Sequence, residues 1–186
     1  GISLIKGIAG AAKDEVDPST EFPVTATWRD ADEQLQSRNL LINAVEPTPL
    51  GVQLPAGTVV TLTEGTSPAF PTVVWGSVVI SGDGVTSTGE RTATVVVSDQ
   101  QSATTLVTVT NEANWAPGTF SVAKTVTGVS LNDADVPPTV SVLATWWEGD
   151  ERHSESFDVP TDGTVTEFPT MIPHGTEVTL TEAGLD

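Results

Sequence analysis

The sequence predicts an all-β protein made of tandem immunoglobulin-like β-sandwich domains, and three observations support this prediction. Threonine and valine are the most frequent residues, and both favour strands. Long stretches of apolar residues with the helical period are absent. Short alternating stretches recur between turns rich in glycine and proline, of which the chain has 16 and 13. This spacing is typical of a sandwich of antiparallel sheets.

Alternation of apolar and polar residues gives the expected strands of the first part of the chain in order. Turns are expected at residues 14–18, 47–49, 55–57 and 81–84, where Gly, Pro and Asp gather. The strands are expected at residues 2–9, 22–29, 38–45, 50–54, 57–64, 72–80, 91–97 and 103–111.

The chain also contains an internal repeat, because four blocks align when the sequence is shifted by 118 residues. Residues 2–6 fall on 120–124, 24–28 on 142–146 and 54–64 on 172–182, and Gly10 falls on Gly128. The repeat predicts a complete domain at 1–116 and a second at 117–186. We expect the second copy to lack the C-terminal strands of the first, and the chain to be part of a longer precursor.

Charge and cysteine content exclude several classes of function. The formal net charge of −18 disfavours nucleic acid and anionic membranes as partners, since both attract clustered lysine and arginine. The chain has no cysteine, so disulfides and thiolate metal sites are excluded. Neither a signal peptide nor a transmembrane stretch is recognisable. This composition suits an extracellular protein.

Lys6 is the anomaly in the first expected strand. Side chains two residues apart share a strand face, so Ile2, Leu4, Lys6 and Ile8 lie together on an apolar face. A charged lysine buried there without a partner is costly. We therefore expect other buried groups to offset the cost of burying this lysine.

Glu64 and Asn111 are the expected partners, because each continues an apolar row on its own strand. Glu64 follows Val60 and Leu62 at every second position. The repeat predicts that this row faces inward, since Val59 on the opposite face is exchanged for a glutamate at 177. Asn111 likewise follows Val107 and Val109.

Burying these three groups together predicts a reaction between them. Burial lowers the pKa of a lysine and raises that of a carboxyl, so the neutral forms of both become accessible. A neutral Lys6 amine can attack the side-chain carbonyl of Asn111 while Glu64 polarises that carbonyl and moves protons. The product is a Lys6–Asn111 isopeptide bond, and ammonia leaves.

With this triplet the chain resembles the Cna-B-type, isopeptide-forming repeat domains of Gram-positive surface adhesins and pilins, especially those of actinobacteria. The resemblance implies lysine as nucleophile, glutamate as catalyst and asparagine as acceptor, joining the first and last strands. In the second copy it extends to Lys124 and to Glu182 as a catalytic residue.

The function implied by the resemblance is that of a stalk segment in a cell-wall-anchored surface protein. It implies no cofactor, no metal and no turnover beyond the self-directed cross-link. The partners it implies are neighbouring repeat domains, with a host surface ligand bound through another domain. Two alternatives are a secreted β-sandwich module that binds a glycan or host protein and an accessory domain of a secreted enzyme. A plainer interpretation of the site is a Lys6–Glu64 salt bridge at a sheet edge, with Asn111 ending a strand.

Other residue clusters favour structure over ligand binding. Acidic residues at 14–17, 30–33, Asp83 and 132–135 could hold calcium, but none matches an EF-hand loop. Trp28 and Trp146 are expected in the core, and Trp115 is expected to pack at the domain junction. Trp75 and Trp147 remain open as parts of a glycan platform. His153 and His174 have no metal-site spacing, and His174 is expected to be exposed.

Overall fold

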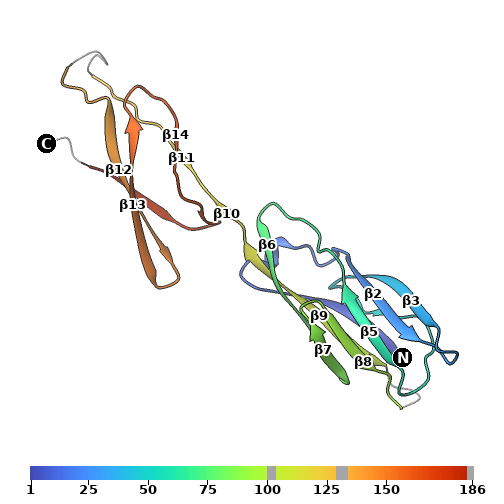
Figure 1. Ribbon diagram of the computed structural model, residues 1–186. Coiled ribbons are helices and arrows are strands. Elements are labelled where there is room, and N and C mark those ends of the chain that lie inside the picture. The colour runs from blue at the N-terminus through green and yellow to red at the C-terminus, as the bar shows by residue number, and fades with distance from the viewer. Residues whose placement is uncertain (100–103, 129–133, 184–186) are drawn as a thin grey trace. The chain divides into compact units, whose positions relative to one another are not determined.

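The computed structural model describes residues 1–99, 104–128 and 134–183, and it is all-β, with several sheets consistent with a β-sandwich (Figure 1). The chain divides into two compact units, Gly1–Asn114 and Trp115–Asp186. Among the described residues, no helix has the length and apolarity needed to cross a membrane.

The first unit contains two sheets. In the first the strand order is β4-β1-β9-β6, and in the second it is β3-β2-β5-β8-β7. A short 3-10 helix, η1 (Lys13–Glu15), follows the first strand. The strands are β1 (Ile2–Ala9), β2 (Phe22–Arg29), β3 (Leu35–Ile42), β4 (Thr48–Pro49), β5 (Val59–Glu64), β6 (Val73–Ser81), β7 (Val85–Gly89), β8 (Thr92–Val96) and β9 (Thr105–Trp115).

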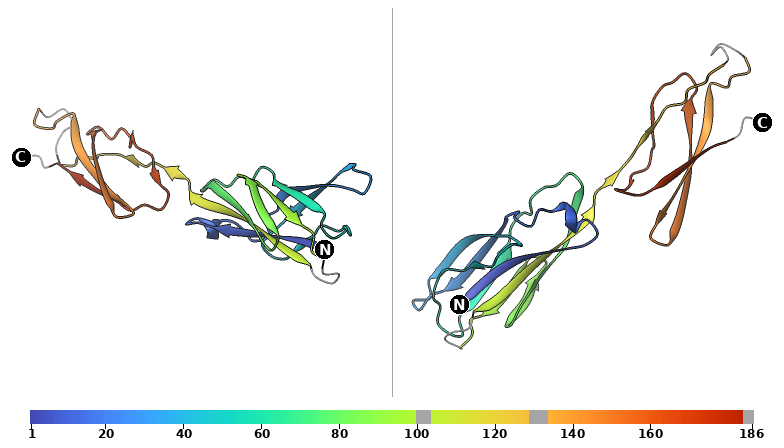
Figure 2. Two further views of the ribbon diagram at one scale, coloured as in Figure 1. Left: turned by 60° about the horizontal axis from the view of Figure 1, so that its bottom comes forward. Right: turned by 180° about the vertical axis from the view of Figure 1, so that it is seen from behind.

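The first and last strands of this unit are parallel neighbours, which corrects the expectation of purely antiparallel sheets. Register pairs run from Ile2↔Thr105 to Ala9↔Glu112, and the two strands lie side by side in each view (Figures 1 and 2). Parallel neighbours need a long crossover connection. Here nearly the whole unit, including all of the second sheet, lies between β1 and β9 and supplies it.

The core of the first unit follows the period-two alternation of its strands. Burial alternates along β1 and β2 and along most of β9. The buried rows include Ile2 and Leu4 on β1, Val24 and Ala26 on β2, Val60 and Leu62 on β5, and Val107 and Val109 on β9. The inner faces of the two sheets therefore enclose one apolar layer.

The observed strands differ from the expected ones at four places. The turn expected at 47–49 is wrong in part, because Thr48 and Pro49 form strand β4. The expected strand at 50–54 is wrong, because Gly51 has a φ of +73° that interrupts the extended backbone. The strand expected at 38–45 is observed three residues earlier, as β3. Strand β7 was not expected, since its residues carry hydroxyls and glycine instead of an alternating apolar row. Residue 103, the expected start of the last strand, lies outside the described residues.

The second unit repeats the pairing of the first on a smaller scale. Its largest sheet has the order β13-β12-β16, and two short pairs, β10 with β15 and β11 with β14, complete it. Val142 pairs with Glu182 in the same register as Val24 with Glu64. The strands are β10 (Pro117–Gly118), β11 (Ser121–Val122), β12 (Thr139–Glu148), β13 (Glu151–Pro160), β14 (Thr166–Glu167), β15 (Ile172–Pro173) and β16 (Val178–Glu182).

The core of the second unit is formed by β12, β13, the loop between β14 and β15, and the start of β15. It contains Val140, Val142, Ala144, Trp146, Phe157, Val159, Phe168 and Ile172. Leu180 on β16 is 43% exposed, although its counterpart Leu62 is fully buried. In the described part of this unit, β11 pairs with β14. No described strand pairs with β11 in the way that β9 pairs with β1 in the first unit.

Gly10 sets how closely β1 and β9 approach. Its φ is +93°, and a Cβ there would lie 2.4 Å from the carbonyl oxygen of Ala113. We expect Gly10→Ala to lower the free energy of unfolding by about 2–4 kcal/mol, because backbone strain and a clash with main chain add together.

Gly57→Ala is the matched control, since Gly57 has a φ of +81° but nothing within 4 Å of the added Cβ. Strain alone should lower its free energy of unfolding by about 1–2 kcal/mol. Denaturant titration of both variants measures the difference. Equal losses would contradict the close approach of β1 and β9.

Candidate functional site

The three polar residues singled out from the sequence meet inside the first unit. Lys6 on β1 and Asn111 on β9 belong to one sheet, and Glu64 on β5 belongs to the other. Their exposed fractions are 3%, 1% and 2%. The prediction that the row ending in Glu64 faces inward is confirmed by this burial.

Strand register brings Lys6 within reach of Asn111. Asn111 is the register partner of Ile8, so Lys6 lies two residues before it on the neighbouring strand and on the same face. Diagonal neighbours of this kind are reached by long side chains. The backbone of Lys6 is also fixed on its other edge, because its N–H donates to the carbonyl oxygen of Asn43 at 2.9 Å.

The Lys6 amine contacts both partners directly. Its Nζ donates to Glu64 Oε1 at 2.5 Å and to Asn111 Oδ1. It also lies 4.3 Å from the centre of the Phe22 ring. The simple arrangement of a lysine reaching solvent at a sheet edge is therefore wrong: the ion pair exists, but both of its side chains are fully buried.

Burial controls the proton on this amine. Removal from water lowers the pKa of Lys6, and the nearby positive charge of Arg91 lowers it further. The hydrogen bond and negative charge of Glu64 act in the opposite direction but do not cancel the effect of burial. The neutral, nucleophilic form of the amine is thus more accessible here than on an exposed lysine.

Two further residues, Arg91 and Ser67, complete the network. Arg91 Nη2 donates to Glu64 Oε2 at 3.0 Å, to the Gly65 carbonyl at 2.6 Å and to Ser67 Oγ at 2.9 Å. Ser67 Oγ also accepts a hydrogen bond from Asn111 Nδ2 at 2.9 Å. Neither residue stood out in the sequence. Ser67 lies outside the expected strands, and Arg91, expected to begin the strand at 91–97, lies in the turn before β8.

The corresponding pair in the second unit is open to solvent. Lys124 Nζ donates to Glu182 Oε2 at 2.7 Å, but the two side chains are 30% and 36% exposed. The asparagine in this part of the sequence, Asn132, lies outside the described residues. This pair thus has the geometry of a surface salt bridge, which contributes little to stability.

The tryptophans divide into buried and exposed ones. Trp28 and Trp146 are 9% and 5% exposed, which confirms that they pack in the cores. Trp75 is also structural: its ring packs edge-on against Phe22 at 5.5 Å, and its Nε1 donates to the Pro68 carbonyl at 2.7 Å.

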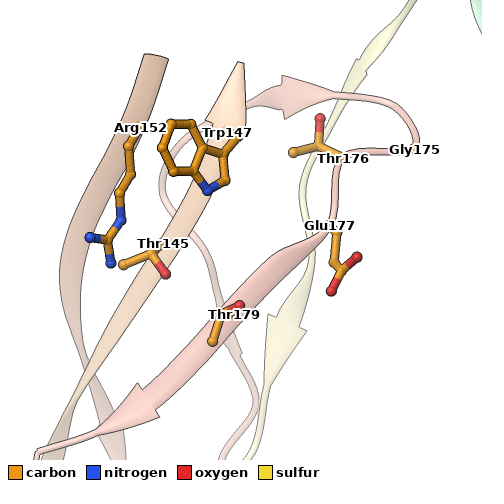
Figure 3. Close-up of a pocket in the computed structure, with 7 residues that line it drawn as sticks. All are labelled: Thr145, Trp147, Arg152, Gly175, Thr176, Glu177 and Thr179. Atoms are coloured by element: carbon orange, nitrogen blue, oxygen red, sulfur yellow. The ribbon is translucent and has the colours of Figure 1, made fainter. Parts of the chain in front are cut away.

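The remaining aromatic groups belong to the second unit. The Trp115 ring lies 5.1 Å from that of His174, which is exposed as expected. Trp147 is 60% exposed. It lines an open hollow of about 660 Å³ together with Arg152, Glu177 and the hydroxyls of three threonines (Figure 3). The alternative function, a secreted module that binds a glycan or host protein, stays a prediction, and it would use this surface.

The acidic side chains in two of the turns accept hydrogen bonds from the backbone of their own loops. Asp30 Oδ1 accepts from the N–H groups of Asp32 and Gln34 at 3.0 and 2.9 Å. Asp17 Oδ1 accepts from the N–H of Ser19 at 2.8 Å. Within residues 1–99, 104–128 and 134–183, no group of three or more potential metal ligands is present. Residues 132 and 133 of the fourth candidate calcium turn lie outside these ranges.

A family model described as a domain of unknown function (DUF5979) matches residues 2–114. This range contains Lys6, Glu64 and Asn111 and ends where the first compact unit ends. Comparison with curated proteins and with solved structures gave no match.

The lowered pKa of Lys6 predicts a pH dependence in a chain that lacks the acceptor. Asn111→Ala leaves the Lys6 amine free to titrate. Because its pKa in the folded state lies below the ordinary 10.5, the unfolded chain binds this proton more tightly. The free energy of unfolding should rise with pH from the folded-state pKa up to about that of the unfolded chain, and then level off.

Denaturant titration across this pH range measures the slope. The double variant Lys6→Met/Asn111→Ala is the control, since it keeps every other titrating group. Subtracting the control should leave a rising contribution. A contribution that falls with pH would mean that the Glu64 ion pair, rather than burial, dominates the energetics of Lys6.

Proposed function

We propose a load-bearing function for this chain, which belongs to the family described as a domain of unknown function (DUF5979). The first unit acts as a stalk segment of a bacterial cell-surface protein, stabilised by an isopeptide bond between Lys6 and Asn111. The observation that carries the proposal is the contact of the buried Lys6 amine with both the Asn111 carboxamide and the Glu64 carboxylate.

The proposed reaction transfers the acyl group of Asn111 from one nitrogen to another. Lys6 Nζ gives a proton to Glu64 and attacks Cγ of Asn111, so that electrons move onto Oδ1. A second proton leaves Nζ, the Cγ–Nδ2 bond breaks, and Nδ2 takes one proton and departs as ammonia. The other proton passes to solvent. Fixed neighbours supply the acceleration, and the reaction occurs once in each chain.

The parallel pairing of β1 and β9 supports a mechanical role. Tension applied to the start of β1 and to the end of β9 pulls these parallel strands along their length in opposite directions, which loads their hydrogen bonds together. A bond from Lys6 to Asn111 carries this tension directly from one strand to the other. The residues between Lys6 and Asn111, which are 105 positions apart, then carry no tension.

The bond also acts on the unfolded chain. By the reasoning used for disulfides, closing a loop of this size stabilises the folded state by about 4–5 kcal/mol through lost chain entropy. The product amide is neutral, so the unit no longer holds a buried ammonium. Glu64 then stays paired with Arg91.

The proposal predicts the mass of the protein. The full chain should be lighter than its sequence by one ammonia, and Glu64→Gln should restore the full mass because the proton acceptor is lost. Intact mass spectrometry under denaturing conditions measures both. A peptide digest should contain the segments around Lys6 and Asn111 as one linked species.

Glu182→Gln is the matched control, since it makes the same change in the exposed pair of the second unit. Its mass deficit should equal that of the unchanged chain. A wild-type chain with its full mass would refute the cross-link, whatever the variants show.

Single-molecule stretching tests the load path. When pulled by its ends, the unchanged first unit should release no internal chain, because the bond bypasses the loop. The Glu64→Gln variant should release roughly 300–350 Å as residues between Lys6 and Asn111 extend. Release of that length by the unchanged unit would contradict the load-bearing role even if the mass deficit is present.

A further inference from the structure

The proposed reaction needs a proton donor for Nδ2 of Asn111, and the hydrogen bonds around this residue do not make Glu64 that donor. For ammonia to leave, Nδ2 must gain a proton. Glu64 is engaged elsewhere: its Oε1 contacts Lys6 Nζ and its Oε2 contacts Arg91. Nδ2 instead donates to Ser67 Oγ at 2.9 Å.

Ser67 has a hydroxyl proton to give. A serine oxygen has two lone pairs and one proton. Both lone pairs are used here, one by Asn111 Nδ2 and the other by Arg91 Nη2 at 2.9 Å. When Lys6 attacks, Nδ2 becomes pyramidal and gains a lone pair of its own, so the direction of the Ser67–Asn111 hydrogen bond can reverse. The adjacent guanidinium favours release of the Ser67 proton.

The surroundings of Ser67 provide a way out for the product. Ser67, Glu64, Arg91 and Trp75 line an open hollow of about 450 Å³. The carboxamide is held with its oxygen on Lys6 and its nitrogen on the Ser67 side of the site. The leaving group therefore faces the side of the site that reaches solvent.

We propose that Ser67 is a catalytic residue of cross-link formation that orients the Asn111 carboxamide and protonates Nδ2 as ammonia departs. The inference rests on the proposed isopeptide reaction. Ser67 Oγ gives its proton to Nδ2 while the Cγ–Nδ2 bond breaks, and water in the hollow returns a proton to Oγ. Glu64 passes a proton taken from Lys6 to the same water, so no proton is gained or lost beyond the one released to solvent.

A refolding time course tests Ser67. Each full chain is assembled by chemical synthesis and kept in denaturant, so that it has its full mass and has never folded. It is then refolded by dilution and quenched in acid at intervals. Intact mass spectrometry gives the fraction lighter by one ammonia. Ser67→Ala should slow the loss of ammonia about a hundredfold, the low end for a positioned proton donor. Ser67→Thr keeps the hydroxyl and should restore the rate to within a few-fold of the original.

Ser77→Ala is the matched control. Its hydroxyl donates to Glu112 Oε2 at 3.1 Å. Glu112 follows Asn111 in the sequence but lies away from the buried cluster. This variant should react at the original rate, and tryptophan fluorescence verifies that each variant refolds.

The outcomes separate the two proposals. An unchanged rate in Ser67→Ala, or equal slowing in Ser67→Ala and Ser77→Ala, overturns the role of Ser67 and leaves the cross-link standing. Slowing in Ser67→Thr as large as that in Ser67→Ala also overturns it, because the hydroxyl is then not the cause. A wild-type chain that never loses ammonia overturns the proposed function itself.

Discussion

The burial of one amine, Lys6 Nζ, is the constraint on which the first unit depends. An ammonium in an apolar core is costly unless its hydrogen bonds are satisfied. Here the carboxylate comes from the facing sheet and the carboxamide oxygen from the adjacent strand. Moving one sheet relative to the other would separate Lys6 from Glu64 and leave a buried charge unpaired. Slipping β9 along β1 by one residue would remove the Asn111 oxygen from the amine. The polar cluster thus specifies both the register and the way the sheets face each other.

The same constraint explains how the core combines apolar packing with reactive chemistry. Each cluster member ends or continues a row of buried aliphatic side chains, so the strands would assemble on hydrophobic grounds alone. That assembly then brings the amine and carboxamide together without a separate binding step. Arg91 keeps Glu64 paired on its second oxygen, and it is only partly buried, with 37% of its side chain exposed. The guanidinium therefore connects the buried carboxylate with solvent.

Much of this arrangement could be predicted from the sequence, because two-residue alternation marks which side chains face inward. Lys6, Glu64 and Asn111 stood out as polar residues in apolar rows, and all three are buried. The parallel pairing of β1 and β9 could not be predicted in this way, since alternation is the same in parallel and antiparallel strands. Ser67 could not be predicted because it lies in a loop, where periodicity is absent. Arg91 was missed because it was expected to begin a strand, whereas it lies in the turn before β8. The strand expected at 50–54 failed because a single glycine with positive φ outweighed a favourable pattern.

The internal repeat places the same pair of residue types in two different environments. Lys124 and Glu182 keep the residue types, the spacing and the strand register of Lys6 and Glu64. Their side chains are nevertheless about one-third exposed, whereas those of the first pair are fully buried. Water screens the exposed pair, whereas burial lowers the pKa of the Lys6 amine. The two units share a motif, yet β9 lies beside β1 in the first unit, and no described strand lies beside β11 in this way in the second. A lysine and a glutamate at the right spacing are therefore insufficient to form a buried pair: the neighbouring strands decide whether water reaches them.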